Sequence, residues 1–514
     1  MLRSSLSLPP PMDRSTPAPA SSPASTGLSF DKTDKLQRRP FCQQLERYLM
    51  VESNYVEGSL VATLAASFGS GKTTFIEMWK EDLLKRRQAA TAETAFTAPM
   101  PVVLNAWESD FCGDPLAAIL SPLLKTAEEW KHPTEISPQT VEKLKEAIRD
   151  IAWTGAGLLN GVTDKFTGIN AIEALELKDQ KKKERNSTQP NQADPPDFIR
   201  IFDQRQNALR QLRTALQEAF APTPPPEAAN PGDLPKTQTP KVLIFVDELD
   251  RCRPDYAIHY LETIKHVFNV KGLVFVLAID AAQLEVSAKA LFGGELNFPE
   301  YYRKFSHRTF HLPQPDTEAI GTLLKELADR HIVCKGQRQS AFVTGDYFTR
   351  MVAPIVHAWK VTPRQLHEAF RILGHSLAIE REHGTMETHN TTISLAYLFA
   401  SLARTAKERV YRDLQTGVSH LFTYQTFKNE LPMSKCDVVT WIYIMNAGIN
   451  RGILDLSRPD EMTMIECTND GNIALQLKKT QDKLGHRHST KAPFQIIYER
   501  IESAYQFEDA YATE

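Results

Sequence analysis

A glycine-rich octamer, Ala66 to Thr73, has the residue types and spacing of a loop that binds nucleotide phosphates. Gly69 and Gly71 permit backbone conformations in which consecutive N–H groups surround a phosphate. Lys72 would reach the β- and γ-phosphates, and the Thr73 hydroxyl would bind Mg²⁺. Ala66 takes the place of the usual first glycine. The pattern predicts a Walker A loop for Mg-ATP, with nucleotide contacts from Ser67, Phe68, Gly69, Ser70, Gly71, Lys72, Thr73 and Thr74.

A second motif consists of the apolar residues 242–246 followed by two carboxylates, Asp247 and Glu248. Ligands of α/β sheets bind at the carboxyl ends of strands, so such a strand would bring both carboxylates to a nucleotide. We expect Asp247 to hold Mg²⁺ through its water shell. Glu248 would orient and deprotonate the attacking water, with Asp250 as the competing choice of base. The other interpretation is a strand that runs into a charged helix cap, but the Walker A loop upstream favours the catalytic one.

A further strand is predicted over residues 273–279 and is followed by Asp280. A polar residue at this place, beside the strand that carries the carboxylates, often contacts the γ-phosphate or the attacking water. Asp280 equally suits the N-cap of a helix that begins at Ala281. The sequence leaves both interpretations open.

An arginine that neutralises the charge developing on the transferred phosphoryl group would complete such a site. Arg364 is the favoured residue, because it opens a predicted helix after Thr362 and Pro363, where a lid over the nucleotide would lie. Basic residues with the same chemistry elsewhere are Arg251, Arg303, Lys304 and Arg308. For each of them the alternative is a surface ion pair. An arginine supplied by a second copy, Arg303 or Arg251, would make the active form a homo-oligomer.

Apolar runs alternate with helical patterns, which predicts right-handed βαβ units and a parallel sheet. A strand over 61–65 precedes the Walker A loop, a helix follows over 73–87, and a short strand is expected over 102–104. The predicted fold class is therefore α/β, a parallel-sheet P-loop NTPase core with a helical insertion, a helical lid and a mixed C-terminal region. Its predicted divisions are a disordered Ser/Pro-rich terminus 1–29, a first core part 30–123, an insertion with a Pro-rich linker 124–241, a second core part 242–315, a lid 316–384 and a C-terminal region without predicted role 385–514.

The composition is that of a globular protein, with 514 residues, 42% apolar and 24% charged, and a formal net charge of −3. That charge gives no global basic surface for nucleic acid. The six cysteines form no CxxC pair and indicate a reducing compartment. The N-terminus has no apolar signal segment, and the apolar stretch 151–162 is too short to span a bilayer. We therefore expect a cytoplasmic protein without an integral membrane span.

Several motifs in order resemble the KAP family of P-loop NTPases over roughly residues 31–375. Their combination is fairly specific, although no single motif is. They are the leader Asp34–Phe41, the loop Phe68–Thr73, Asn105–Glu108 with Asp114–Leu116, Asp247–Cys252, Ala278–Asp280, Tyr301 with Lys304, Phe310–Pro313 and Thr362–Gln365.

The resemblance implies an architecture similar to that of AAA+ and STAND ATPases. Members of the family often carry transmembrane segments between the two Walker motifs, whereas residues 124–241 contain no adequate span. Some bacterial members exclude phage, so the resemblance implies an ATP-driven motor or switch that acts with partner proteins in antiphage defence. A nucleotide-gated scaffold with little or no turnover is the alternative, and the intact Glu248 favours hydrolysis. A nucleic-acid enzyme is disfavoured by the net charge.

Overall fold

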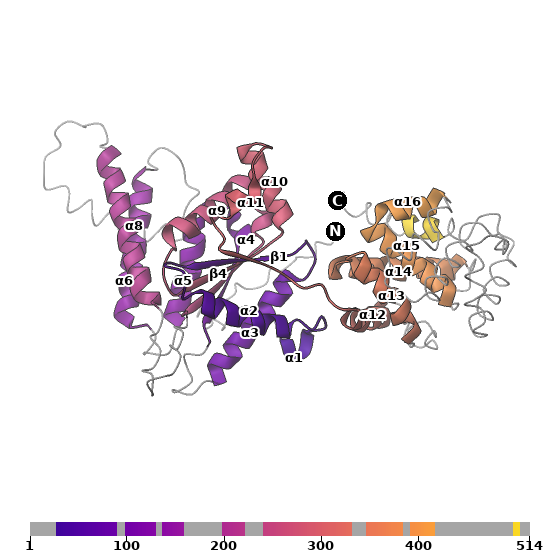
Figure 1. Cartoon of the computed structure of the whole chain (residues 1–514). Helices are drawn as coiled ribbons and strands as arrows, with labels where there is room; N and C mark the ends of the chain where they lie inside the picture. Colours follow the sequence, from indigo (N-terminus) through magenta and orange to yellow (C-terminus); the bar gives the residue numbers. More distant parts are fainter. Residues whose placement is uncertain are drawn as a thin grey trace, which may run out of the picture.

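The computed structural model describes residues 27–89, 98–129, 136–158, 198–221, 240–331, 346–383, 391–416 and 497–503. These residues form an α/β part built on a parallel sheet and an all-helical part, joined by the segment that follows the last strand (Figure 1). The predicted α/β class with a parallel-sheet core is confirmed.

Five parallel strands form one sheet in the order β2-β3-β4-β1-β5. They are β1 (Leu60–Ala65), β2 (Met100–Asn105), β3 (Val242–Asp247), β4 (Leu273–Ile279) and β5 (Arg308–His311). β1, β3 and β4 are buried along their whole length, as central strands covered on both faces must be. The sequence did not predict β5, because its residues are mostly exposed and lack an apolar run. This strand forms by pairing with β1.

The registers align the carboxyl ends of β1, β2, β3 and β4. Ala65 lies opposite Ile279, Asp247 opposite Ala278, and Asn105 opposite Asp247. The loops that follow these strands therefore leave the sheet at one edge, where ligands of α/β proteins bind. Because β4 lies between β1 and β3, the phosphate-binding loop and the carboxylates come from strands that are not neighbours.

Helices connect the strands and cover both faces of the sheet. Those of the α/β part are α1 (Phe30–Thr33), α2 (Arg39–Glu52), α3 (Lys72–Ala89), α4 (Ala106–Asp110), α5 (Pro115–Glu129), α6 (Pro138–Leu158), α8 (Phe198–Phe220), α9 (Pro254–Val267), α10 (Ala281–Phe292) and α11 (Phe298–Tyr302). A short 3-10 helix, η1 (Leu249–Arg251), directly follows β3.

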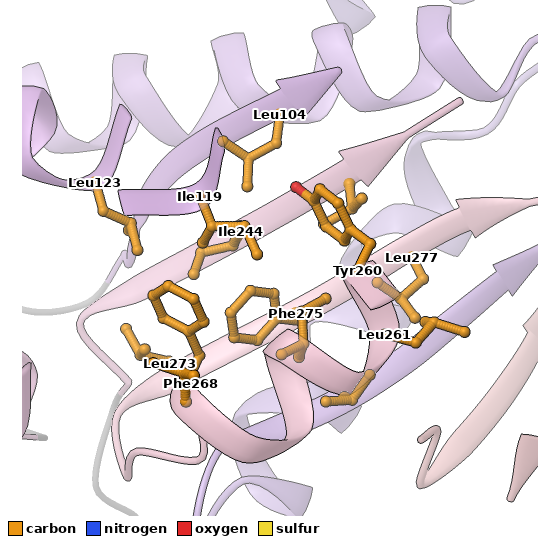
Figure 2. Packing of buried hydrophobic residues seen from close by; sticks show 14 of the residues in the cluster. Leu104, Ile119, Leu123, Ile244, Tyr260, Leu261, Phe268, Leu273, Phe275 and Leu277 are labelled. Carbon is orange, nitrogen blue, oxygen red and sulfur yellow. The ribbon is translucent and has the colours of Figure 1, made fainter. Parts of the chain in front are cut away.

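Alternate residues of each strand face two different apolar cores. Leu243 and Phe245 of β3 pack against α1, α2 and α3. Ile244 and Val246 of the same strand pack on the opposite face against α5, α9 and α10. Figure 2 shows part of this second core, in which side chains of α5 and α9 cover β2, β3 and β4. Full burial of one such Leu, Ile or Phe side chain stabilises the fold by about 1.5–3 kcal/mol.

The segment between β2 and β3 holds α4, α5, α6 and α8, of which α6 and α8 pack along each other at the end of the molecule opposite the helical part (Figure 1). Leu144 of α6 and Leu212 of α8 join the same core as the sheet. The predicted insertion 124–241 thus starts within α5 and shares the α/β core. Among the described helices, none is long and apolar enough to cross a bilayer.

The helical part consists of α12 (Thr317–His331), α13 (Asp346–Ala358), α14 (Pro363–His383), α15 (Thr391–Ala406), α16 (Glu408–Thr416) and the helical residues 497–503. They share one apolar core, in which Leu324, Phe370, Phe399 and Ile501 are buried. The predicted lid boundary at residue 384 falls inside this core, since α15 packs against α14.

Several predictions concern residues outside the described part of the chain. They include most of the predicted disordered terminus 1–29, the Pro-rich linker up to residue 239, and most of the region 385–514.

Candidate nucleotide-binding site

The loop between β1 and α3 has the backbone shape that its glycines predict. Gly69 and Gly71 adopt positive φ angles of 78° and 88°, which residues with a Cβ enter only at a cost. The Ser67 carbonyl accepts from the Ser70 N–H at 3.2 Å and tightens the turn. The chain then enters α3, whose first N–H groups have no partner within the helix and face outward, as in an anion-binding site.

Lys72 is the first residue of α3 and is 9% exposed. Its ammonium donates to the Ala66 carbonyl at 2.7 Å, so the side chain folds back across the loop. An ammonium has three donors, and the others remain for phosphate oxygens. Thr74 follows in the first turn of α3 and is exposed.

The two Walker motifs meet at one hydrogen bond. The Thr73 hydroxyl donates to Asp247 Oδ2 at 2.6 Å, across 174 residues of sequence. Asp247 Oδ1 accepts from the Glu248 N–H at 2.9 Å. Burial raises the pKa of Asp247, while the hydrogen bonds from Thr73 and from the Glu248 N–H act in the opposite direction. A hydroxyl and a carboxylate in contact are oxygen ligands that Mg²⁺ takes together with phosphate oxygens and water.

Glu248 leaves β3 in a left-handed conformation, with φ 61° and ψ 19°. This conformation costs a residue other than glycine roughly 1 kcal/mol. One carboxylate oxygen pairs with the Arg251 guanidinium at 2.9 Å, and the other accepts from the Asn105 amide at 3.3 Å. The carboxylate is therefore held at the sheet edge with both oxygens engaged.

Asp250, the competing choice of base, lies two residues further along the chain, in η1. Its Oδ1 is buried without a hydrogen-bond partner. Burial raises the pKa of Asp250, and the nearby Lys72 ammonium opposes that change. The two candidate bases thus occupy different surroundings: Glu248 is in an ion pair, whereas Asp250 is partly buried with one unpaired oxygen.

Asp280 connects the end of β4 to the phosphate-binding loop. Its Oδ1 caps α10 by accepting from the Ala282 N–H at 3.1 Å. Its Oδ2 accepts from the Phe68 N–H at 3.1 Å. The capping interpretation therefore fits the geometry, and the same carboxylate also orients the loop.

Arg364 is brought to the phosphate-binding loop by the start of α14. Its backbone N–H donates to the Gly69 carbonyl at 3.3 Å, and its guanidinium lies 4.3 Å from the centre of the Phe68 ring. Arg251 stacks on the same ring at 4.9 Å and also lies 5.8 Å from the Trp107 ring. Two of the predicted arginines thus flank Phe68 beside the loop.

The other basic candidates lie away from the loop, as their partners show. Arg308 pairs with Glu52 at 2.8 Å and with the Tyr48 hydroxyl at 3.0 Å, both on α2. Lys304 lies 5.5 Å from the Tyr301 ring, and Arg303 closes α11. The structure therefore does not bring these three basic residues to the site with Arg251 and Arg364.

Two residues at the site were given no role by the sequence, although both belong to the family motifs. Asn105 ends β2 and contacts Glu248. Arg38 precedes α2, is 4% exposed, and its Nη1 donates to the Gly71 carbonyl at 3.4 Å. A polar residue that follows a strand could have pointed to Asn105, but no local signal distinguishes Arg38 from Arg39.

Several buried polar atoms around the loop have no hydrogen-bond partner. Of six such side-chain atoms in the described residues, three are Arg38 Nε, Ser70 Oγ and Asp250 Oδ1. Native proteins rarely leave buried polar atoms unpaired, and a cluster of them is typical of a site that binds a polar ligand. Two of the three are donors, which suits phosphate oxygens. The residues present therefore fit a bound nucleotide.

Comparison with known proteins agrees with this site. The family model described as KAP family P-loop domain matches residues 38–379. No curated protein matches the chain. Among solved structures, the Aeropyrum Pernix ORC2 protein in its ADPNP-ADP complexes aligns with 11% identity over 92% of this chain and 95% of that chain, with a TM-score of 0.30.

Proposed function

The chain belongs to the KAP family of P-loop NTPases, and from that premise we propose that it binds Mg-ATP and hydrolyses it. The observation that carries the proposal is the 2.6 Å hydrogen bond from Thr73 to Asp247. It joins the hydroxyl of one motif to the carboxylate of the other, which is the arrangement that divalent-cation binding at a phosphate requires.

The phosphate-binding residues would act through charge and orientation. Lys72 would donate its remaining N–H groups to the phosphates, and the N–H groups of the loop would donate to the same oxygens. Thr73 and Asp247 would hold Mg²⁺. When bound, this ion neutralises charge on the phosphate oxygens.

Glu248 is the residue that would position the attacking water and accept its proton. Its carboxylate would first have to leave Arg251 and Asn105, which hold it at 2.9 Å and 3.3 Å. The Arg251 and Glu248 side chains are 33% and 15% exposed, so the pair is partly shielded from water and nucleotide binding would have to displace it. Arg251 would then be free to approach the phosphate beside Arg364.

The biological role that we propose follows from the family. An ATP-driven motor or switch would act with partner proteins in antiphage defence, and the α6–α8 hairpin and the helical part offer surfaces for such partners (Figure 1). A homo-oligomer would be needed if a second copy supplied an arginine.

A second function, a nucleotide-gated scaffold with little turnover, is favoured by one observation. Both oxygens of the Glu248 carboxylate are already engaged. If they stay engaged when nucleotide binds, the chain would bind ATP without activating a water.

A single-turnover assay separates the two functions. We expect wild-type protein to release phosphate from ATP, and Glu248→Gln to bind ATP normally while hydrolysing it 10²–10⁴-fold more slowly, the usual contribution of a general base. Glu262→Gln is the matched control, since Glu262 is exposed on α9. Binding without turnover in the wild type supports the scaffold, and absence of binding refutes both functions.

A further inference from the structure

Arg38 is held beneath the phosphate-binding loop by a tight turn. The carboxylate of Asp34 accepts from the backbone N–H groups of Arg38 at 2.8 Å and of Arg39 at 2.9 Å. Gln37 adopts a left-handed φ of 52° between them. These contacts fix the residue before α2 and direct the Arg38 side chain inward, where 4% of the residue is exposed.

The Arg38 guanidinium has few hydrogen-bond partners for a buried charged group. Within the described residues its hydrogen bonding is limited to the contact from Nη1 to the Gly71 carbonyl, which is long at 3.4 Å, and Nε has no partner. The Gly71 carbonyl already accepts from the Phe75 N–H at 3.0 Å. A guanidinium carries five N–H donors and no acceptor, so the buried Nε–H in particular lacks the partner that burial demands.

The charge of Arg38 persists in this position. Burial lowers the pKa of the guanidinium to about 10, and the Asp34 carboxylate opposes part of that change. The side chain therefore remains positive at neutral pH. A buried cation with free donors needs an anionic acceptor close by.

The position of the guanidinium identifies that acceptor. A Cβ built on Gly71 would lie 3.1 Å from Arg38 Nη1, so the guanidinium touches the loop where it enters α3. In a loop of this class the backbone there cradles the α- and β-phosphates. The neighbouring arginine, Arg39, instead pairs with Asp31 at 2.7 Å on the surface.

We propose that Arg38 is a nucleotide-binding residue whose guanidinium donates to an α- or β-phosphate oxygen of the nucleotide in the loop. The inference rests on the proposed function, because it assigns a further contact to the same site. ADP and ATP share these phosphates, so Arg38 acts on both alike. The planar guanidinium can donate two parallel hydrogen bonds to two phosphate oxygens, and the single ammonium of a lysine cannot reproduce that bidentate contact.

The same turn also contacts the helical part. Lys35 forms an ion pair with Glu326 of α12, and Leu36 packs against the apolar core of the helical part. Residues 34–38 therefore touch both the phosphate-binding loop and the helices beyond the sheet.

The test measures the dissociation constants of Mg-ADP and Mg-ATP by titration calorimetry for wild type, Arg38→Met, Arg38→Lys and the control Arg39→Met. We expect Arg38→Met to weaken both nucleotides by a similar factor of roughly 10 to 100, the loss of a charge-assisted hydrogen bond. Arg38→Lys should lose less than Arg38→Met, and Arg39→Met should bind like wild type. Without nucleotide, Arg38→Met should unfold no earlier than wild type, because an unsatisfied buried charge has been removed.

Two outcomes overturn the inference in different ways. If wild type and Arg39→Met bind nucleotide and folded Arg38→Met binds within about threefold of them, Arg38 does not contact the phosphates and only this inference fails. If Arg38→Met does not fold, Arg38→Lys decides the matter, and an affinity equal to that of wild type counts against the fork contact. Failure of the wild type to bind either nucleotide refutes the proposed function, and this inference with it.

Discussion

The docking of α14 on the phosphate-binding loop can be tested with a single methyl group at Gly69. The substitution Gly69→Ala places a Cβ 2.8 Å from the Arg364 Cβ and 3.1 Å from the Thr362 hydroxyl oxygen. Carbon atoms prefer a separation of about 3.5–4.0 Å, so the first turn of α14 must move away by roughly 0.7 Å or more. Neither Cβ can rotate out of the contact, because each is bonded directly to the backbone.

The expected loss of stability has two sources. A left-handed φ of 78° costs alanine roughly 1 kcal/mol. Displacement of α14 also breaks the 3.3 Å hydrogen bond from the Arg364 N–H to the Gly69 carbonyl, worth about 0.5–1.5 kcal/mol. We therefore expect Gly69→Ala to lower the free energy of unfolding by about 2 kcal/mol, and the helical part to undock before the sheet unfolds.

The assay is amide hydrogen exchange of the first turn of α14, followed by mass spectrometry, with urea unfolding alongside. Gly69→Ala should speed exchange there, and Arg364→Gly should restore part of the loss in the double variant, because it removes the Cβ that clashes. Gly293→Ala is the matched control: its φ is 95°, but no atom lies within 4 Å of the new Cβ, so it adds strain without touching α14. Equal exchange of α14 in both alanine variants, or no coupling between residues 69 and 364, would refute the docking.

Three further expectations concern single side chains. Lys72→Ala should weaken Mg-ATP binding by at least about 100-fold while thermal unfolding without nucleotide hardly changes, because a phosphate-facing charge is lost; wild-type affinity would contradict the Walker A assignment. Arg364→Ala removes a cation–π contact with Phe68 worth about 0.5–1 kcal/mol and should reduce ATP affinity and turnover; values within twofold of wild type, with unchanged stability, would make Arg364 a surface residue. Burial raises the pKa of Asp250, so its stabilising contribution is complete below about pH 4 and is lost as pH rises through the raised pKa. Asp250→Asn should then unfold at a higher temperature than wild type at pH 7 but not at pH 4, and a lower unfolding temperature at pH 7 would refute this.

Local sequence patterns predicted the central strands and the helix after the loop. The runs 242–246 and 273–279 are continuous and apolar, so they had to be covered on both faces, and both form strands. β5 escaped prediction because its strand conformation depends on hydrogen bonds to β1 rather than on its own residues. The strand order could not be predicted from local patterns either, because the burial of a strand does not reveal its neighbours. In the structure β4 lies between β1 and β3.

The site was predictable where a motif fixes its own geometry. Gly69 and Gly71 require positive φ angles, and the contact between Thr73 and Asp247 follows from the two Walker motifs. The left-handed backbone of Glu248 and its ion pair with Arg251 depend on the turn after β3, which no motif describes. Arg38 lies 33 residues from Gly71, and only the tertiary packing of its turn makes the contact visible.

The connection between β2 and β3 can change in length without changing the registers of the sheet. The registers that align Asn105 with Asp247 depend on hydrogen bonds between the two strands, and not on the length of the connection between them. Doubling a flexible connection costs only about 0.6 kcal/mol of closure entropy. An insertion in this connection that leaves α6 and α8 packed on the sheet would therefore keep the phosphate chemistry intact. The crossover between β2 and β3 is therefore the place in this sheet where added residues disturb the nucleotide site least.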